Sequence, residues 1–309
     1  MTHRVFVTGA TGVLGRAAVP VLVAAGIRVT GVARSAVGAD RLRAAGATPI
    51  TVDLFDGDAV RAAVAGHDAI VHLATAIPPM TRMHRRAAWR TNDRLRVDAT
   101  RALLDAARAN GIDRVVKESV TFPYLDGGDA WLDESAPVDP AKAWRSTLAG
   151  ERLVTGWTGS GGAGVVLRFG ALYAADARST DEVRRLARWG LAPVPGPSDA
   201  FVSAVHAADA ATAIRAALDA PPAVYNVVDD RPLRRRELAD AVARAFGTGR
   251  LRAVPAETMR WIGGDGARGL TASQRVDNRA FAAATGWAPQ WVDAAAGWAA
   301  IGRQSVVAG

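Results

Sequence analysis

The stretch Arg4–Gly15, which reads RVFVTGATGVLG, constrains this chain more than any other. It predicts a short apolar strand, a tight glycine turn and then a helix that runs to about Ala25. Gly9, Gly12 and Gly15 recur at every third position through the turn. Free backbone N–H groups and the helix dipole favour an anion at such a helix N-terminus. The stretch therefore predicts a binding site for the diphosphate of a dinucleotide.

Each glycine of this turn has its own expected role. Gly9 permits the turn, Gly12 lets the backbone approach the phosphates, and Gly15 lets the helix lie close to the strand. Three neighbours complete the predicted cofactor-binding loop: Thr11, Val13 and Leu14. The alternative is a structural turn without a ligand, but the strand before the glycines and the helix after them are the context that the motif requires.

Composition narrows the class of protein. The chain has 309 residues, of which 50% are hydrophobic and 22% charged, so we expect one or two domains with a full core. It has no cysteine, which excludes disulfides, thiolate metal ligands and a cysteine nucleophile. Its five histidines are scattered, so no metal site is predicted. Without a signal-peptide pattern or a long apolar run, we expect a cytoplasmic protein that does not associate with membranes.

The net charge of +8 comes almost wholly from arginine, because lysine occurs only at positions 117 and 142. These charges are spread through Ala/Arg-rich helical segments. A nucleic-acid-binding protein would concentrate them on one face, so no nucleic-acid partner is expected. The predicted partner is a small-molecule substrate, and the charge gives a modest bias towards anionic ligands.

Apolar runs alternate with helical patterns as far as about residue 170. Strands are predicted at Arg4–Thr8, Arg28–Ala33, Thr48–Val52, Ala69–Leu73, Arg114–Ser119 and Gly164–Arg168. Helices are predicted at Val13–Ala25, Gly38–Ala45, Asp58–Ala65, Trp89–Asn110 and Ala141–Thr155. Glycines that suit left-handed C-caps follow four of these helices: Gly26, Gly46, Gly66 and Gly111. The alternation predicts an α/β fold of Rossmann type, a doubly wound parallel sheet with helices on both faces.

The regularity falls after residue 170. Short strands are predicted at Phe201–Val205 and Val224–Val228, and helices at Ala208–Leu218, Arg235–Phe246 and Trp291–Gly302. We therefore expect two domains. Residues 1–170 form the NAD(P)-binding domain, and residues 171–309 form a smaller α+β substrate-binding lobe, with the chain returning to the main domain near residues 201–228.

The end of the second predicted strand bears on which dinucleotide binds. It reads VTGVARS, so Arg34 stands where an acidic residue would hydrogen-bond the ribose 2′-hydroxyl of NAD(H). Arginine instead pairs with a 2′-phosphate, and Ser35 follows it. NADP(H) is therefore the predicted cofactor. NAD(H) is the alternative if Arg34 is only one more surface arginine.

Other strand ends supply the remaining predicted cofactor contacts. Asp53 and Leu54 follow the third strand, where the carboxylate can accept from the adenine amino group. The ends of the fourth and sixth strands would bring backbone close to the cofactor, through Leu73, Ala74, Thr75, Phe169 and Gly170. His72, at the end of the fourth strand, is either a catalytic base or a hydrogen-bonded scaffold residue.

Taken together, these motifs resemble the extended or atypical short-chain dehydrogenases/reductases of the NAD-dependent epimerase/dehydratase group. The similar segments lie between residue 4 and about residue 246, in the order TGATGVLG, DL, HLA, ATRALLDAARANGIDRVV, GVVLRFGALY, VHAADAA and YNVVDD. The resemblance implies NAD(P)-dependent chemistry on a small molecule. It also implies a homodimer paired through helices four and five.

The resemblance further implies a Tyr-x-x-x-Lys pair in the helix after Glu134, where the tyrosine exchanges a proton with the substrate oxygen and the lysine lowers its pKa. This chain lacks the pair. One count places Trp144 and Leu148 there, the other places Ala143 and Thr147 there, and the helix contains no tyrosine.

The fifth predicted strand offers other catalytic candidates. It continues as RVVKESVTFPY, and Lys117 and Glu118 are charges in an otherwise apolar run. Because buried charges are costly unless paired, they indicate either a functional site or an exposed strand end. In the site hypothesis, Ser119 or Thr121 holds the substrate carbonyl, Tyr124 donates the proton, and Lys117 or Glu118 tunes it. The alternative for Tyr124 is a packed aromatic residue at the turn.

Three functions fit these residues. The first is an NADP(H)-dependent oxidoreductase that acts on a carbonyl or enone with non-standard catalytic residues. The second is a non-redox epimerase, lyase or cyclase that keeps the nucleotide, and the third is a catalytically silent nucleotide sensor. His206 and Asp209 are expected to be mainly structural, and Trp131 and Trp144 are candidate cleft walls.

Overall fold

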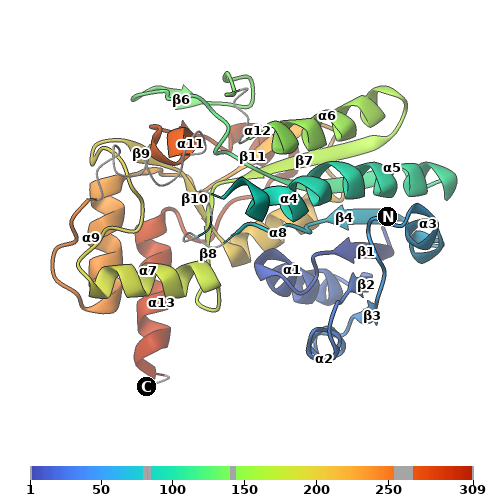
Figure 1. Cartoon of the computed structure of the whole chain (residues 1–309), viewed down its shortest axis with the longest axis horizontal. Coiled ribbons are helices and arrows are strands. Elements are labelled where there is room, and N and C mark those ends of the chain that lie inside the picture. The colour runs from blue at the N-terminus through green and yellow to red at the C-terminus, as the bar shows by residue number, and fades with distance from the viewer. Residues whose placement is uncertain (1, 79–81, 83–84, 140–143, 254–266, 308–309) are drawn as a thin grey trace.

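The structure is a computed structural model, which describes residues 2–78, 82, 85–139, 144–253 and 267–307. Seven of the described strands form one parallel sheet in the order β11-β7-β5-β4-β1-β2-β3 (Figure 1). They are β1 Arg4–Thr8, β2 Arg28–Val32, β3 Thr48–Ile50, β4 Ala69–His72, β5 Arg114–Val120, β7 Ala163–Phe169 and β11 Val224–Val227. The order reverses between β1 and β4, as in a doubly wound sheet. The predicted Rossmann-type α/β fold is therefore confirmed.

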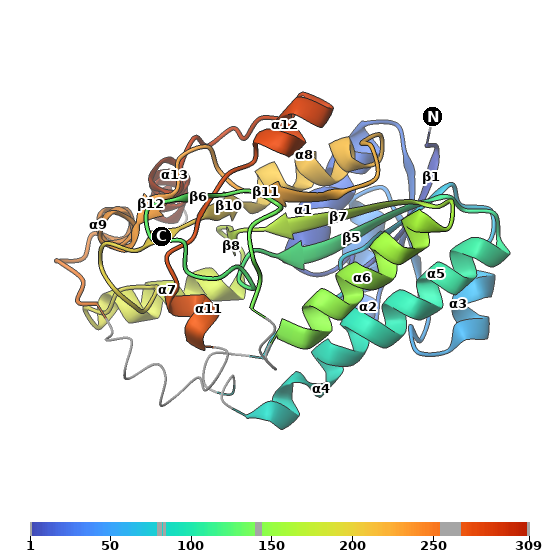
Figure 2. The ribbon, with the colours of Figure 1, turned by 90° about the horizontal axis from the view of Figure 1, so that it is seen from above.

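Helices cover both faces of this sheet. One face carries α1 (Val13–Ala24), α2 (Ala36–Ala44) and α8 (Ala207–Ala217), and the other carries α3 (Gly57–Val64), α5 (Thr100–Ala109) and α6 (Arg145–Gly159). Figure 2 shows α5 and α6 running side by side, across the sheet from α1 and α8. Within the described ranges, no helix is both long and apolar enough to span a bilayer.

The central strand β1 contributes side chains to the cores on both faces of the sheet, because successive side chains of a strand point to opposite faces. Val5 and Val7 enter the core under α1 and α8, whereas Phe6 enters the core under α3 and α5. All three are fully buried. Each such side chain contributes about 1.5–3 kcal/mol on burial, so the strand is stabilised from both sides.

Local signals place the helix ends. All four glycines expected at C-caps have positive φ angles, which confirms that prediction: Gly26, Gly46, Gly66 and Gly111. At the N-terminus of α2, the Ser35 hydroxyl oxygen accepts from the Gly38 N–H at 3.2 Å. Asp56 caps α3 in the same way. Each cap satisfies a backbone group that the helix itself leaves unpaired.

The long helix predicted near Trp89–Asn110 is interrupted. It consists of α4 (Arg86–Arg94), a π-helical turn at Leu95–Ala99, and α5. In a π turn the hydrogen bonds span five residues instead of four, which changes the direction of the side chains that follow. The turn lies against the end of β4, where the Leu95 carbonyl oxygen is 3.1 Å from His72 Nε2.

A second group of elements completes the fold, and most of it lies beside the main sheet at the left of Figure 1, although its helix 279–285 packs on β11. Its helices are α7 Arg178–Arg188, α9 Arg235–Phe246, α11 Ala267–Thr271, α12 Arg279–Thr285 and α13 Ala294–Val307. Its short strands are β6 Trp131–Leu132, β8 Ala171–Tyr173, β9 Phe201–Val202, β10 Ala204–His206, β12 Leu233–Arg234 and β13 Arg275–Val276. Leu238, Val242, Trp298 and Ile301 form the centre of a separate core there.

The single strand predicted at Phe201–Val205 is two strands. β9 pairs with β12, whereas β10 pairs with β8. Ser203 separates them, because its hydroxyl donates to the Gln274 carbonyl oxygen at 3.0 Å and accepts from the Val276 N–H at 2.9 Å. These partners lie far along the chain, so the local pattern did not reveal the break.

The chain enters the lobe after β7 and comes back to the main sheet. α8 packs on α1, and β11 forms the edge of the sheet beside β7. The beginning of the predicted helix at Ala141–Thr155 lies outside the described residues, and α6 begins at Arg145. The domain boundary near residue 170 stays a prediction.

Gly15→Ala should destabilise the fold, because a Cβ there would lie 2.3 Å from the Gly9 carbonyl oxygen. We expect the free energy of unfolding in urea to fall by about 1–3 kcal/mol. Gly156→Ala is the matched control, since Gly156 lies inside α6 with open space around it. That control should be neutral or stabilising by up to about 1 kcal/mol. Equal stability of the two variants would contradict the tight packing of the turn.

Candidate functional site

The glycine turn between β1 and α1 has no room for a side chain at two of its positions. Gly9 has a φ of +68°, and a Cβ there would lie 2.5 Å from the Leu73 carbonyl group. A Cβ at Gly15 would lie 2.4 Å from the Ala10 carbonyl carbon. Gly9 therefore packs the turn against the end of β4, and Gly15 holds α1 against the turn.

Gly12 differs, because space is open beside it. Among the described residues, a Cβ at Gly12 would meet only the Gly9 oxygen, at 3.2 Å. Gly12 is the N-cap of α1, no side chain caps this end, and the first turn carries no acidic residue. The backbone N–H groups of this end can therefore bind an anion. The turn fits the diphosphate of a dinucleotide, which the Val13 and Leu14 N–H groups would hold, since the Gly12 N–H already donates to the Gly9 carbonyl oxygen at 2.9 Å.

The turns after β1 and β2 lie next to each other. A Cβ at Gly38, in the first turn of α2, would be 3.0 Å from the Thr11 methyl group. Ser35 caps that helix, and Arg34 before it is exposed and makes no ion pair with a described residue. The first turn of α2 and its cap Ser35 thus lie near the glycine turn, and Arg34 directly precedes them. The contact of Arg34 and Ser35 with a 2′-phosphate stays a prediction.

The other predicted cofactor residues lie along the carboxyl ends of the strands. Asp53 is exposed after β3, and its Oδ1 accepts from the Phe55 N–H at 3.0 Å. The Leu73 N–H donates to the Thr8 carbonyl oxygen at 3.1 Å, which keeps the end of β4 beside the glycine turn. Leu54 and Phe169 are buried, and Ala74 and Thr75 are half-buried. A Cβ at Gly170 would lie 2.8 Å from the Ser203 carbonyl oxygen, so this glycine permits a close approach of the lobe.

His72 is enclosed by protein at the end of β4. Its Nε2 lies 3.1 Å from the Leu95 carbonyl oxygen and therefore donates, so its Nδ1 accepts from the Thr8 hydroxyl at 2.7 Å. Burial and, after it, the charge of Lys117 lower the pKa of His72 to about 3, which keeps the imidazole neutral. The geometry matches a scaffold residue rather than a catalytic base.

A buried ion pair joins α6 to β7 beneath the predicted site. Arg168 binds the Glu151 carboxylate through Nε at 3.0 Å and Nη2 at 2.7 Å. Ser119, predicted to hold the substrate, donates to the same carboxylate at 2.5 Å. Burial opposes the charge of Arg168, but Glu151 holds its pKa above the ordinary value. The Ser119 hydroxyl is therefore committed to Glu151.

Tyr124 belongs to the same buried network. It is 1% exposed, and its hydroxyl donates to Asn226 Oδ1 at 2.8 Å while accepting from Arg168 Nη1 at 2.8 Å. Burial raises the pKa of Tyr124, which disfavours its ionisation. This geometry matches the packed-aromatic alternative. Proton donation by Tyr124 stays a prediction, and it would require the bond to Asn226 to break.

Lys117 and Glu118 are both buried, so the exposed-strand-end alternative is wrong. The Lys117 ammonium donates to the Glu118 carbonyl oxygen at 3.1 Å, and the Glu118 carboxylate lies 3.4 Å from Arg96 Nη2. Burial and, next, the charge of Arg96 lower the pKa of Lys117 to about 8. The strand therefore carries a charged pair into the interior, with a third charge supplied by the π turn.

The start of α6 holds an indole where the family resemblance implies a tyrosine. Trp144 is buried and stacks on Phe122, with ring centroids 6.1 Å apart. Its Nε1–H has no hydrogen-bond partner among the described residues. Thr147 and Leu148 are buried in the same helix, and Ala143 lies outside the described residues. Neither count of the motif places a proton donor beside an ammonium here.

Other singled-out residues have structural contacts. His206 caps α8 through Nδ1, and Asp209 accepts from the Gln290 and Trp291 N–H groups at 2.7 and 3.3 Å. Trp131 is 43% exposed and lies under the Arg275 guanidinium at 4.1 Å. These contacts match the mainly structural role expected for His206 and Asp209.

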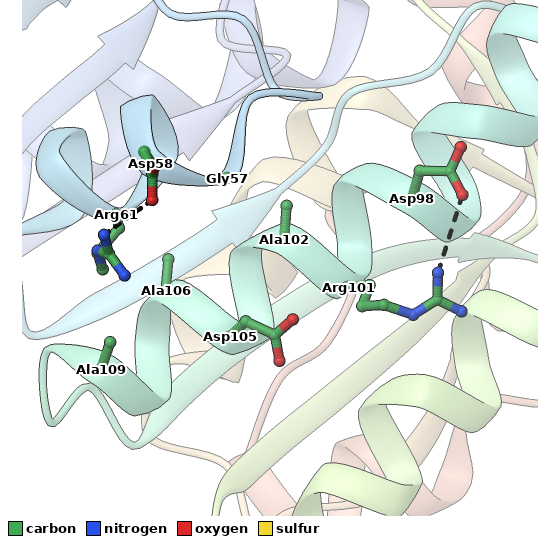
Figure 3. Close-up of a pocket in the computed structure, with 9 residues that line it drawn as sticks. All are labelled: Gly57, Asp58, Arg61, Asp98, Arg101, Ala102, Asp105, Ala106 and Ala109. Atoms are coloured by element: carbon green, nitrogen blue, oxygen red, sulfur yellow. Dashed lines mark hydrogen bonds and ion pairs between the residues drawn. The ribbon is translucent and has the colours of Figure 1, made fainter.

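A groove of about 400 Å³ lies between α3 and α5, outside this site (Figure 3). Arg61 pairs with Asp58 at 2.8 Å on one side of it, and Arg101 lies 3.9 Å from Asp98 on the other. None of the residues that line it belongs to the predicted cofactor or catalytic set. Among the described residues, no cluster of three or more possible metal ligands occurs.

Sequence reasoning missed four residues of the buried network: Arg96, Glu151, Arg168 and Asn226. Two of them carried a usable signal, because Arg168 and Asn226 are single polar residues in the apolar runs GVVLRF and VYNVV. Arg96 gave no such signal in the sequence, since it is one of many arginines in an arginine-rich helix.

Comparison with known proteins identifies the family. The family model described as "NAD dependent epimerase/dehydratase family" matches residues 5–227. The chain belongs to this family. A 3-diazoavenalumate denitrifying reductase from a Streptomyces species is 34% identical over 301 residues, which are 93% of this chain and 96% of the relative. This epimerase/dehydratase family member is therefore an NAD(P)-dependent enzyme of oxidoreductase or epimerase type.

Two further proteins are similar to this epimerase/dehydratase family member, one in sequence and one in fold. A 4-hydroxy-2-methyl-3-oxo-4-farnesyl-3,4-dihydroquinoline-1-oxide ketoreductase from Stigmatella aurantiaca is 34% identical over 177 residues, 56% of this chain and 51% of the relative. The crystal structure of the UDP-glucose 4-epimerase of Thermus thermophilus in complex with NAD has a TM-score of 0.76 at 22% identity, and the match covers 97% of this chain and 99% of that one. The second likeness concerns the fold alone.

Glu151→Gln should lower the free energy of unfolding by about 3–5 kcal/mol, because it leaves Arg168 buried without its counter-charge. Glu151→Leu combined with Arg168→Met should recover most of the loss, as measured by urea unfolding of the single and double variants. Asp40→Asn, in the exposed pair with Arg43, should change stability by less than about 1 kcal/mol. A strictly additive double variant would contradict the pairing.

Proposed function

We propose that this chain is an NADP(H)-dependent reductase that delivers hydride to an electron-poor small molecule without a tyrosine–lysine proton donor. One observation carries the proposal. An open dinucleotide turn at Gly12 lies at the same edge of the sheet as the start of α6, where the expected tyrosine–lysine positions hold Trp144 and Leu148 by one count and Ala143 and Thr147 by the other. The bound nicotinamide would supply the hydride, and the protein would bind and orient the acceptor.

Arg34 supports NADP(H) rather than NAD(H). It is exposed, unpaired among the described residues and adjacent to the helix that Ser35 caps. A carboxylate at this place would repel a 2′-phosphate, whereas a guanidinium binds it through two hydrogen bonds. Thr11, next to this turn, would close the site on the other side.

A carbonyl or enone acceptor requires a proton after hydride transfer. The Ser119 hydroxyl already donates to Glu151, and the Tyr124 hydroxyl already donates to Asn226. Thr121 is the remaining candidate of the fifth strand to hold the substrate oxygen, and its N–H anchors it to the Phe169 carbonyl oxygen at 3.0 Å. With Thr121 as the holding group, the proton would come from water.

A second acceptor class needs no proton. The name of the full-length Streptomyces relative describes reduction of a diazo compound with loss of nitrogen. For an aryl diazonium ion, the hydride forms the new C–H bond while the C–N bond breaks, and N₂ leaves with that electron pair. A reaction that needs no proton suits a site with an indole at Trp144 in place of a phenol. An indole N–H donates a hydrogen bond but does not release its proton at neutral pH.

Arg34→Ala should abolish the preference for NADP(H). We expect the wild-type protein to bind NADPH about 10- to 100-fold more tightly than NADH, the range of a charge-assisted pair. The variant should bind both with similar affinity in calorimetric titrations. Arg43→Ala, an exposed arginine of α2 already paired with Asp40, should keep the preference. Unchanged discrimination in Arg34→Ala would refute the 2′-phosphate contact.

The reductase itself is tested with NADPH carrying deuterium at nicotinamide C4. We expect oxidation of the nucleotide, with deuterium in the new C–H bond, on at least one of three acceptors: an aryl ketone, an enone or a benzenediazonium salt. N₂ released in proportion to NADPH consumed would select the diazo class. Conversion of a sugar nucleotide without net NADPH loss would instead favour the non-redox alternative. Nucleotide binding with no turnover on any acceptor would contradict the proposal. Tyr124→Phe with undiminished turnover would remove Tyr124 as proton donor.

A further inference from the structure

A cluster of buried charges lies where β4 ends beside β5, and no coenzyme contact has been assigned to it. Lys117 of β5 stands opposite His72, the last residue of β4, in the register of the sheet. Arg96 comes from the π turn, and its Nη2 lies 3.4 Å from the Glu118 carboxylate. Arg96, Lys117 and Glu118 are each at most 5% exposed.

Positive charge is in excess within this cluster. Arg96 Nε and Nη1 have no hydrogen-bond partner among the described residues, although the residue is only 2% exposed. Glu151, the next buried carboxylate, is already bound by both Arg168 and Ser119. The three buried cations Arg96, Lys117 and Arg168 therefore face only two buried carboxylates, those of Glu118 and Glu151. Buried N–H groups without an acceptor are costly, so the two free nitrogens of this guanidinium call for an acceptor, and the excess positive charge favours one that is negatively charged.

The neighbouring helix is shaped around these two cations. A Cβ at Gly150 of α6 would lie 2.4 Å from the Arg96 carbonyl oxygen and 2.8 Å from Lys117 Cε. Glycine is unfavourable inside a helix, and here it lets α6 approach both segments. The π turn that carries Arg96 is a rare feature that occurs often at functional sites.

Several unpartnered buried groups at this edge of the sheet are donors. Besides the two nitrogens of Arg96, the Trp144 indole N–H and the Asn226 side-chain amide have no partner among the described residues. Trp144 is 7% exposed and stacks on Phe122, which follows β5. Donors without acceptors at one edge of the sheet are what a site for an anionic, oxygen-bearing ligand provides.

We propose that Arg96, assisted by Lys117, is an anion-binding subsite of the substrate pocket and takes a carboxylate carried by the substrate. The inference rests on the proposed function, because it names the chemical class of the molecule that is reduced. The two carboxylate oxygens match the planar fork of a guanidinium, and Glu118 holds that guanidinium from its other side. A bound carboxylate neutralises the excess charge and satisfies Arg96.

The test compares cinnamate with cinnamamide, two ligands of nearly equal shape that differ in charge. Each is titrated calorimetrically into the full chain saturated with NADP⁺. Cinnamate should bind at least about 10-fold more tightly than cinnamamide, and Arg96→Gln should weaken cinnamate about 10- to 100-fold while changing cinnamamide by less than about twofold. Arg101→Gln, an exposed arginine of α5, should leave both affinities unchanged.

Equal wild-type affinities for the two ligands, binding of neither, or discrimination that survives in Arg96→Gln would overturn the subsite. Thermal unfolding reports whether each variant folds. If Arg96→Gln does not fold, Arg96→Lys should keep a reduced preference for cinnamate, and Lys117→Met should lower the preference. Reduction of neutral acceptors by a protein without carboxylate preference would remove the subsite and leave the reductase standing. Carboxylate preference in a protein that oxidises no NADPH would support the subsite and contradict the proposed reductase.

Discussion

The close approach of backbone to backbone at the glycine turn is the constraint on which the rest of the structure depends. Gly9 brings the turn against the end of β4, and Gly15 brings the first turn of α1 against Gly9 itself. Any larger side chain at either position would move α1 relative to the sheet. α1 in turn supports α8, and α8 leads the chain back to β11. Gly9 and Gly15 therefore align both α1, whose N-terminus is predicted to bind the dinucleotide, and the edge strand β11.

A layer of buried polar groups fills the face under α6 in place of the tyrosine–lysine pair. Glu151 and Arg168 form its rigid part, since two parallel hydrogen bonds fix the guanidinium against the carboxylate. Tyr124 and Asn226 extend it across to β11, and Arg96 with Lys117 extends it towards β4. In the rigid part every guanidinium nitrogen of Arg168 has a hydrogen-bond partner, whereas two nitrogens of Arg96 have none among the described residues. This difference separates groups that hold the fold together from groups that are available to a ligand.

The sequence predicted the sheet well, because strand and helix periodicity are local properties. β1 agrees residue for residue with its expected range, and the left-handed glycines end their helices as expected. The glycine turn was predictable for the same reason. The break at Ser203 was not, because it depends on Gln274 and Val276, which are distant in sequence. The network around Arg168 was hidden likewise, since its members meet only through the register of β5, β7 and β11.

The π turn has a geometric consequence for the chain. A π turn behaves as one residue added to an α-helix, and each residue of an α-helix turns the direction of the side chains by about 100°. Deleting a single residue between Leu95 and Ala99 would let α4 run into α5 without a change of phase. Arg96, which now lies beside Glu118, would then point away from β5, while α5 kept its packing against the sheet. The inward direction of that guanidinium therefore depends on the extra residue in the helix as well as on its neighbours Gly150 and Glu118.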